Sequence, residues 1–177
     1  ARFAAPGDLS PAMAAAPLAY DPSERLRTPP WMPGGLLRSS SVRMFNELWF
    51  RAAPRHRDGQ LQSIARYFHP HDGVVDWNRI YGRQGFVQWQ MVVPDGQADV
   101  LRRCVEELGE SPAPCFLAVL KRFGPANPGP LSFPLEGWTL AADMPAMAAG
   151  LAPLLDRLDR AVAEAGGRIY LAKDGRL

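Results

Sequence analysis

The 177-residue sequence predicts an α+β fold in which an antiparallel sheet carries helices on one face. From residue 85 onward, apolar residues recur with the period of a strand or of a helix in the order β-α-β-β-α-β, which is the ferredoxin-like split unit. The apolar share of 47% and the charged share of 21% are typical of a soluble globular protein. The 18 prolines and 16 glycines gather outside the periodic segments, which predicts long loops rather than disorder.

The first half of the chain is predicted to contain a long loop and two extra strands. Residues 1–22 are rich in alanine and proline, and proline and glycine recur between residues 21 and 41. Such punctuation is typical of irregular backbone, so we expect residues 21–45 to form a mobile loop. The alternating apolar residues of Asn46–Ala52 and Leu61–Phe68 predict an antiparallel pair of strands.

Six segments are predicted to build the core, and each has a clear period or a clear stop signal. In chain order they are the strand Gly85–Val93, the helix Asp95–Leu108, the strands Cys115–Phe123 and Trp138–Asp143, the helix Leu151–Ala165 and the strand Arg168–Ala172. Gly109 follows the first helix and Gly166-Gly167 the second, as expected at helix ends. Pro153 is compatible with a helix only because it lies in the first turn.

The first strand of this core has two unlike faces. Val87, Trp89, Met91 and Val93 form a wholly apolar set, so we expect them under the helices. The alternate face then carries Phe86, Gln88, Gln90 and Val92 away from the helices. In this topology the first and third strands are central neighbours, which places Thr139 and Ala141, or else their alternates, beside the glutamines. The second strand flanks the third and brings Lys121 and Phe123.

This open face is predicted to be a floor for a polar ligand. Taken alone, the glutamines favour a solvated strand face, and Lys121 alone favours a surface lysine that ends a strand. Two phenyl rings on the same face favour the ligand interpretation, because a solvated face seldom keeps them. Lys173 follows Ile169 and Leu171 at alternating positions, so its amine must pair with a neighbour or reach an anion or a cofactor.

Other classes of function are disfavoured by composition and spacing. His69 and His71 with Asp72 lack further ligands, so no metal site is predicted. Cys104 and Cys115 have no metal or CxxC spacing and are predicted to be free thiols, which fits a reducing compartment. No membrane span or signal peptide is predicted.

An RNA-binding alternative arises from the sequence GFVQW at residues 85–89, which looks like part of an RNA-recognition motif. That signature belongs on the third strand, whereas here it lies on the first. The third strand, TLAAD at residues 139–143, has no aromatic residue to stack on a base. The net charge of +2 also supplies no basic stripe. We therefore expect no nucleic-acid partner.

Three stretches of sequence carry a resemblance to a known family. They are FHPHDGVVDWNRIYG with the following GFVQWQMVVP, KRFGPANPGPLSFPLEGW, and IYLAKDGR, starting at residues 68, 85, 121 and 169. In this order they resemble the substrate domain of FAD-linked oxidases of the vanillyl-alcohol-oxidase type, which are related to arabinono-lactone oxidase. The resemblance extends from about Pro17 to the last residue.

The resemblance implies that residues 1–177 are the substrate-binding cap domain of a larger FAD-dependent oxidoreductase. The implied partners are the FAD-binding domain of the same longer chain, a sugar on a polyprenyl phosphate, and a separate NADH-dependent reductase that completes an epimerisation to the arabinose form. Both ends look cut, and no glycine-rich turn opens a helix, so we expect this piece to be inactive and to bind no FAD. The implied location is the cytoplasm or the periphery of the inner membrane. A free-standing ligand-binding domain is the alternative.

The resemblance also implies a set of site residues. Lys173 is the implied catalytic and flavin-contacting residue, and the implied substrate-binding residues are Phe68, Gln88, Gln90, Lys121, Phe123, Thr139 and Ala141. The family has Tyr at position 68, Asn at 139 and Cys at 141. Each departure removes or shortens a polar group, so the sugar is expected to differ more readily than the chemistry.

Overall fold

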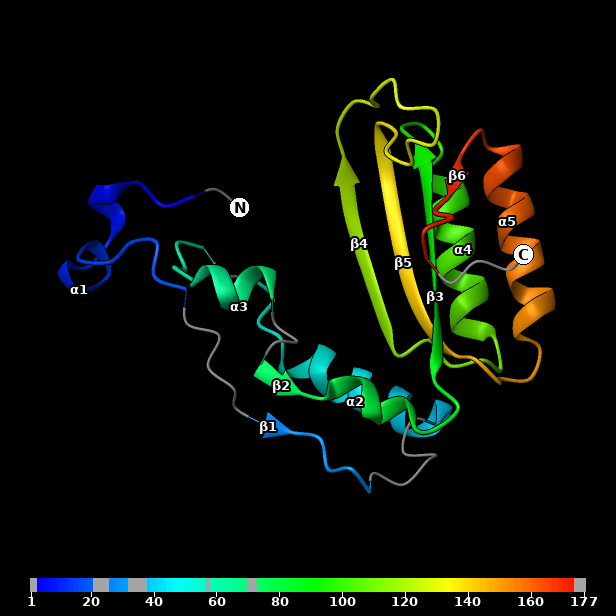
Figure 1. The fold of residues 1–177 in the computed structure, drawn as a ribbon, viewed down its shortest axis with the longest axis horizontal. Helices are drawn as coiled ribbons and strands as arrows, with labels where there is room; N and C mark the ends of the chain where they lie inside the picture. Colours follow the sequence, from blue (N-terminus) through cyan, green and yellow to red (C-terminus); the bar gives the residue numbers. More distant parts are fainter. Residues whose placement is uncertain (1–2, 21–25, 32–37, 57, 70–72, 174–177) are drawn as a thin grey trace.

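The computed structural model describes residues 3–20, 26–31, 38–56, 58–69 and 73–173. Figure 1 shows two unlike parts: a sheet backed by two helices, built by the second half of the chain, and an extended N-terminal part beside it. The α+β class predicted from the sequence is confirmed.

The sheet has four strands in the order β4-β5-β3-β6, and every neighbouring pair is antiparallel. The strands are β3 (Phe86–Pro94), β4 (Leu117–Phe123), β5 (Gly137–Pro145) and β6 (Arg168–Ile169). The first and third strands of the core, β3 and β5, are therefore the central pair, as predicted.

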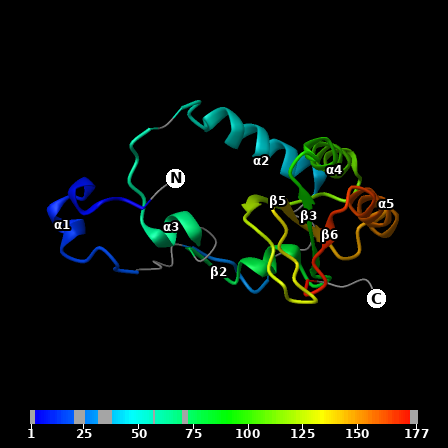
Figure 2. The same ribbon diagram turned by 90° about the horizontal axis from the view of Figure 1, so that it is seen from above.

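Helices α4 (Ala98–Glu110) and α5 (Leu151–Glu164) cover one face of the sheet, as Figure 2 shows from above. The core lies between them and the predicted face of β3, where Trp89 is 5% exposed and Met91 and Val93 are 0% exposed. The other core residues are Leu140, Ala142 and Met144 of β5, Val100, Cys104 and Leu108 of α4, Ala113 after α4, and Leu151, Leu154, Leu155, Leu158 and Val162 of α5.

Two polar or steric details fix this packing. The indole Nε1 of Trp89 donates to Asp159 Oδ1 at 2.7 Å, which joins the sheet to α5. Gly137 begins β5 with a φ of 153°, and a Cβ there would lie 2.0 Å from the Val93 carbonyl oxygen. The close approach of β5 to β3 therefore requires glycine at this position.

The N-terminal part is made of one 14-residue helix, α2, and several elements of two to five residues. They are η1 (Pro6–Asp8), α1 (Pro11–Ala14), β1 (Leu26–Arg27), α2 (Ser39–Ala52), α3 (Ile64–Phe68), β2 (Val74–Val75) and η3 (Trp77–Tyr81). Strands β1 and β2 pair in parallel, with Leu26 opposite Val74. This pairing ties the beginning of the chain to the segment that leads into β3.

The predicted strands at Asn46–Ala52 and Leu61–Phe68 are wrong, since α2 and α3 occupy these stretches. In α2 the residues Val42, Phe45 and Trp49 recur every three or four positions, which is a helical stripe. Seven residues are too few to separate this period from alternation. Ser63 is the N-cap of helix α3, and its hydroxyl accepts a hydrogen bond from the Arg66 backbone amide.

Two further expectations concern loops and ends. The predicted mobile loop at residues 21–45 includes the start of α2, which is regular from Ser39, while residues 21–25 and 32–37 lie outside the described residues. The last strand was predicted to reach Ala172 but ends at Ile169. The chain then turns, and the Lys173 backbone amide donates to the Tyr170 carbonyl at 3.2 Å.

Among the residues that the structure describes, no helix is both long enough and apolar enough to cross a membrane.

Candidate functional site

The sheet face turned away from α4 and α5 carries the predicted ligand floor. Strand register sets its rows: Gln88 lies opposite Asp143, Gln90 opposite Ala141, and Val92 opposite Thr139. Strand β4 continues these rows with Leu117, Val119 and Lys121, in that order. The assignment of the glutamines to the face opposite the helices is therefore confirmed.

One end of the floor is built around a buried carboxylate. Asp143 is 1% exposed, and its Oδ1 accepts from Gln88 Nε2 at 2.6 Å while its Oδ2 accepts from the Tyr81 hydroxyl at 3.3 Å. Burial, reinforced by the charge of Asp143, raises the pKa of Tyr81 far above its ordinary value. The phenol is therefore a hydrogen-bond donor at any physiological pH.

The middle of the floor holds the second glutamine. Gln90 Nε2 donates to Thr139 Oγ1 at 3.1 Å, and Thr139 is 1% exposed. The backbone carbonyl of Gln90 accepts from the Tyr170 amide at 2.9 Å, which extends the pairing of β3 with the C-terminal segment. Thr139 thus contributes by orienting Gln90 rather than by offering its own surface.

Aromatic rings form the other end of the floor. Phe123 meets Phe133 edge to face at 5.7 Å, and Phe133 stacks on Tyr170 at 4.5 Å between ring centroids. The amine of Lys173 lies 5.9 Å from the Tyr170 ring centroid, within range of a cation–π contact. Arg168 donates to the carbonyls of Ser132 and Pro134 and so holds the loop that carries Phe133.

The structure brings most of the predicted site residues together. Gln88, Gln90, Lys121, Phe123, Thr139 and Ala141 share the open face through β3, β4 and β5. Lys173 lies beside this face through its contact with Tyr170, but in an exposed turn and not on a strand.

Phe68 is not brought to this face. It lies in α3, is 57% exposed, and meets the neighbouring Tyr67 ring edge to face at 4.9 Å. It lines an open depression together with Phe3 and Ile64 of the N-terminal part. Figure 1 shows α3 well apart from the sheet.

Sequence reasoning missed Asp143 and Tyr81. Asp143 follows Thr139 and Ala141 at period two, so the same alternation that placed them also places Asp143 on the open face. Tyr81 ends the WNRIYG stretch and stacks on Phe86 at 4.2 Å. Nothing local in the sequence signals that a residue 62 positions away would share a hydrogen bond with Asp143.

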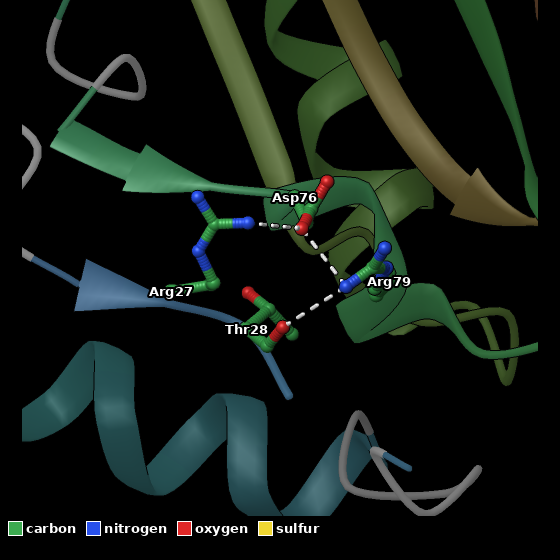
Figure 3. Close-up of polar contacts among 4 residues, drawn as sticks. All are labelled: Arg27, Thr28, Asp76 and Arg79. Carbon is green, nitrogen blue, oxygen red and sulfur yellow. Dashed lines mark hydrogen bonds and ion pairs between the residues drawn. The ribbon is translucent and has the colours of Figure 1, made fainter. Parts of the chain in front are cut away.

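A network of charges holds the segment that delivers Tyr81. Asp76 has a φ of 57°, an uncommon conformation for a residue other than glycine. Its carboxylate pairs with Arg79 at 2.8 Å and with Arg27 at 3.6 Å, and Arg79 also donates to the carbonyl of the buried Thr28 at 3.4 Å (Figure 3). The network links β1 to η3, whose last residue is Tyr81.

The cysteines are free thiols, as predicted. Burial raises the pKa of Cys104 and of Cys115 to about 11, so both are protonated and poorly nucleophilic at neutral pH. No group of three potential metal ligands occurs among the described residues. His69 meets the Tyr20 ring edge to face at 5.9 Å, whereas His71 and Asp72 lie outside the described residues.

Comparison with known proteins confirms the resemblance seen in the sequence. The chain is 39% identical over 160 residues to the decaprenylphosphoryl-beta-D-ribose oxidase of Mycolicibacterium smegmatis, which covers 90% of this chain and 34% of that protein. It is 40% identical over 184 aligned positions to an uncharacterized protein encoded in the mprA 5′ region of Streptomyces coelicolor, covering 98% of this chain and 48% of that protein. No protein-family model matches. The chain thus spans between a third and a half of the length of these relatives, one of which is an oxidase.

Proposed function

We propose that this chain is the substrate-binding domain of a FAD-dependent oxidoreductase that oxidises a sugar hydroxyl to a keto group. The observation that carries the proposal is the similarity, over 90% of this chain, to an oxidase named for a decaprenylphosphoryl ribose. The grouping of six of the eight implied site residues on or along one sheet face supports it.

The substrate class we propose is a pentose on a polyprenyl phosphate. The amides of Gln88 and Gln90 provide hydrogen-bonding groups for sugar hydroxyls. The exposed amine of Lys121, one row further along β4, supplies a positive charge for a phosphate. The rings of Phe123 and Tyr170 give an apolar surface for the sugar face or the start of the lipid.

The two helices that cover the sheet, α4 and α5, do not fit the pyrophosphate of FAD. A pyrophosphate is usually held by backbone amides at a helix start, where the helix dipole favours negative charge. Helix α4 has Asp99 in its first turn, which repels a phosphate, and α5 begins with the buried Leu151. We therefore assign the nucleotide to a separate FAD-binding domain of the same longer protein, and the substrate side to this chain.

The residues of this chain would bind and orient the sugar, while the flavin supplied by the other domain would accept the hydride. Lys173 adds a positive charge at the aromatic end of the floor. This charge would stabilise the negative charge that develops during the reaction. A separate NADH-dependent reductase would reduce the keto sugar, so that the two enzymes together epimerise one carbon.

The proposal is tested with the longest protein that the gene encodes. We expect it to carry flavin absorbance that is bleached anaerobically by a polyprenylphosphoryl pentose, with a keto sugar detected by mass spectrometry. The double variant Gln88→Ala/Gln90→Ala is expected to bleach more slowly at low substrate, while the 177-residue chain alone stays colourless. A flavin that no lipid-linked or free pentose reduces would refute the proposed activity.

A further inference from the structure

The two glutamines of the floor are held by acceptors of different chemistry. Gln88 donates through Nε2 to the carboxylate of Asp143, and Gln90 donates through Nε2 to the hydroxyl of Thr139. Each acceptor side chain is 1% exposed, whereas the glutamines are half-buried. The buried residues therefore form a layer beneath the groups that a ligand would meet.

The carboxylate of Asp143 determines which way the Gln88 amide faces. An ionised carboxylate has no hydrogen to donate, so only the NH₂ end of the amide can bond to it. The reversed amide would place a carbonyl oxygen 2.6 Å from a buried, negatively charged oxygen. Because the bond is charge-assisted and shielded from water, the correct orientation is strongly favoured.

A second donor keeps the carboxylate itself in place. The Tyr81 hydroxyl donates to Asp143 Oδ2, and stacking on Phe86 at 4.2 Å fixes the Tyr81 ring. The raised pKa of Tyr81 keeps this hydroxyl protonated. Both oxygens of Asp143 are thus engaged by side chains from η3 and β3.

The Thr139 hydroxyl does not impose the same restriction on Gln90. A hydroxyl both accepts and donates, so it bonds to either end of an amide. Gln90 therefore serves as an internal comparison for Gln88: the same residue type, two positions along the same strand, with a less selective partner.

We infer that Asp143 is a positioning residue that fixes the Gln88 amide with its NH₂ inward, so that the Gln88 carbonyl oxygen is the group offered to a ligand. This part of the floor then selects ligands that donate, such as sugar hydroxyls, over anions that only accept. A carbonyl oxygen has two lone pairs, so it accepts from a ligand even where a neighbour already donates to it. The inference rests on the proposed function in taking the open face as the sugar site.

The orientation is tested by NMR on the unaltered 177-residue chain. We expect a through-hydrogen-bond coupling between Gln88 Nε2 and the Asp143 carboxyl carbon, and slow solvent exchange of one Gln88 Nε2 proton. Asp143→Asn should abolish the slow exchange, since an asparagine amide bonds to Gln88 in either orientation. Thr139→Val should alter the Gln90 signals and leave those of Gln88 unchanged. Absence of the coupling, or fast exchange in the wild type, would overturn the inference even if every variant failed to fold.

The selectivity is tested by titrating the same chain with methyl ribofuranoside, with an analogue lacking one hydroxyl, and with inorganic phosphate. We expect the riboside to shift the Gln88 side-chain signals most, the deoxy analogue less, and phosphate not at all. In Asp143→Asn the difference between riboside and phosphate should shrink. An equal response to phosphate, or no response to the riboside, would refute the selectivity. Neither measurement involves a flavin, so a failed inference is distinguishable from a failed oxidase assay.

Discussion

The N-terminal part and the sheet unit contain helices of the same kind with opposite fates. Helices α4 and α5 bury their apolar stripes against the sheet, and Leu158 of α5 is 0% exposed. Helix α2 also has an apolar stripe, yet Phe45 is 60%, Trp49 70% and Phe50 78% exposed. Local pattern is therefore enough to shape a helix, whereas stability depends on a surface to pack against.

The contrast predicts its largest effect in a matched pair of truncations. Leu158→Ala should lower the free energy of unfolding by about 2–5 kcal/mol, because it opens a cavity in the core. Leu48→Ala removes the same atoms from a residue that is 62% exposed. It should change the free energy of unfolding by no more than about 0.5 kcal/mol. Urea denaturation followed by circular dichroism measures both. Equal losses would show that α2 is as well packed as α5.

A second prediction uses pH to sharpen the contrast. Burial raises the pKa of Cys104 from 9.0 to about 11, so the folded state holds its thiol proton where the unfolded state has lost it. The contribution of Cys104 to the free energy of unfolding is therefore fully present below pH 9. It falls by about 2 kcal/mol as the pH rises toward 11. Cys104→Ala should flatten that decline relative to its own value at pH 7. An unchanged slope in the variant would contradict the role of burial.

A third prediction extends the contrast to the proposed FAD-dependent oxidoreductase. Lys173→Ala should lower the rate of flavin reduction at saturating substrate about tenfold or more, if its charge acts in the transition state. A raised KM with unchanged rate would instead assign it to the phosphate of the substrate. Phe68→Ala, in the N-terminal part, is the comparison and should change neither value. A strong effect of Phe68→Ala would show that α3 closes onto the sheet during turnover.

The smallest expected effect concerns an ion pair on α2. Glu47 and Arg51 are 2.8 Å apart at i and i+4, on side chains that are 56% and 75% exposed. Glu47→Ala should lower the free energy of unfolding by no more than about 0.5 kcal/mol, and this loss should disappear at high salt. Circular dichroism at low and high ionic strength measures it. A larger, salt-independent loss would mean that Glu47 has a partner besides Arg51.

The same contrast explains how far the sequence predicted the structure. Alternation in β3 predicted the buried set around Met91 and the open set around Gln88, because each strand face has a uniform environment. The stretch Asn46–Ala52 was misassigned because its short alternating pattern does not correspond to a strand in a sheet. The helical stripe can be recognised only when the residues from Val42 onward are included.

The site was predictable where it followed a strand and not where it depended on distant contacts. Register placed Thr139 and Ala141 correctly beside Gln90. Asp143 accepts a hydrogen bond from Tyr81, which belongs to a segment held by Asp76 and Arg79. No local sequence pattern predicts this long-range contact. Lys173 does not continue the predicted alternation of Ile169 and Leu171, because pairing of β6 with β3 stops at Ile169.

The bond between Trp89 and Asp159 makes one of the five tryptophans an optical reporter. The indole of Trp89 is held in the core, so its fluorescence is expected at shorter wavelength and out of reach of acrylamide, whereas that of Trp49 is accessible to the quencher. The fluorescence of a variant whose only tryptophan is Trp89 would therefore report the unfolding of the sheet unit alone. A variant whose only tryptophan is Trp49 would change its emission when another molecule binds over α2. Trp49 would therefore report binding at this exposed helix.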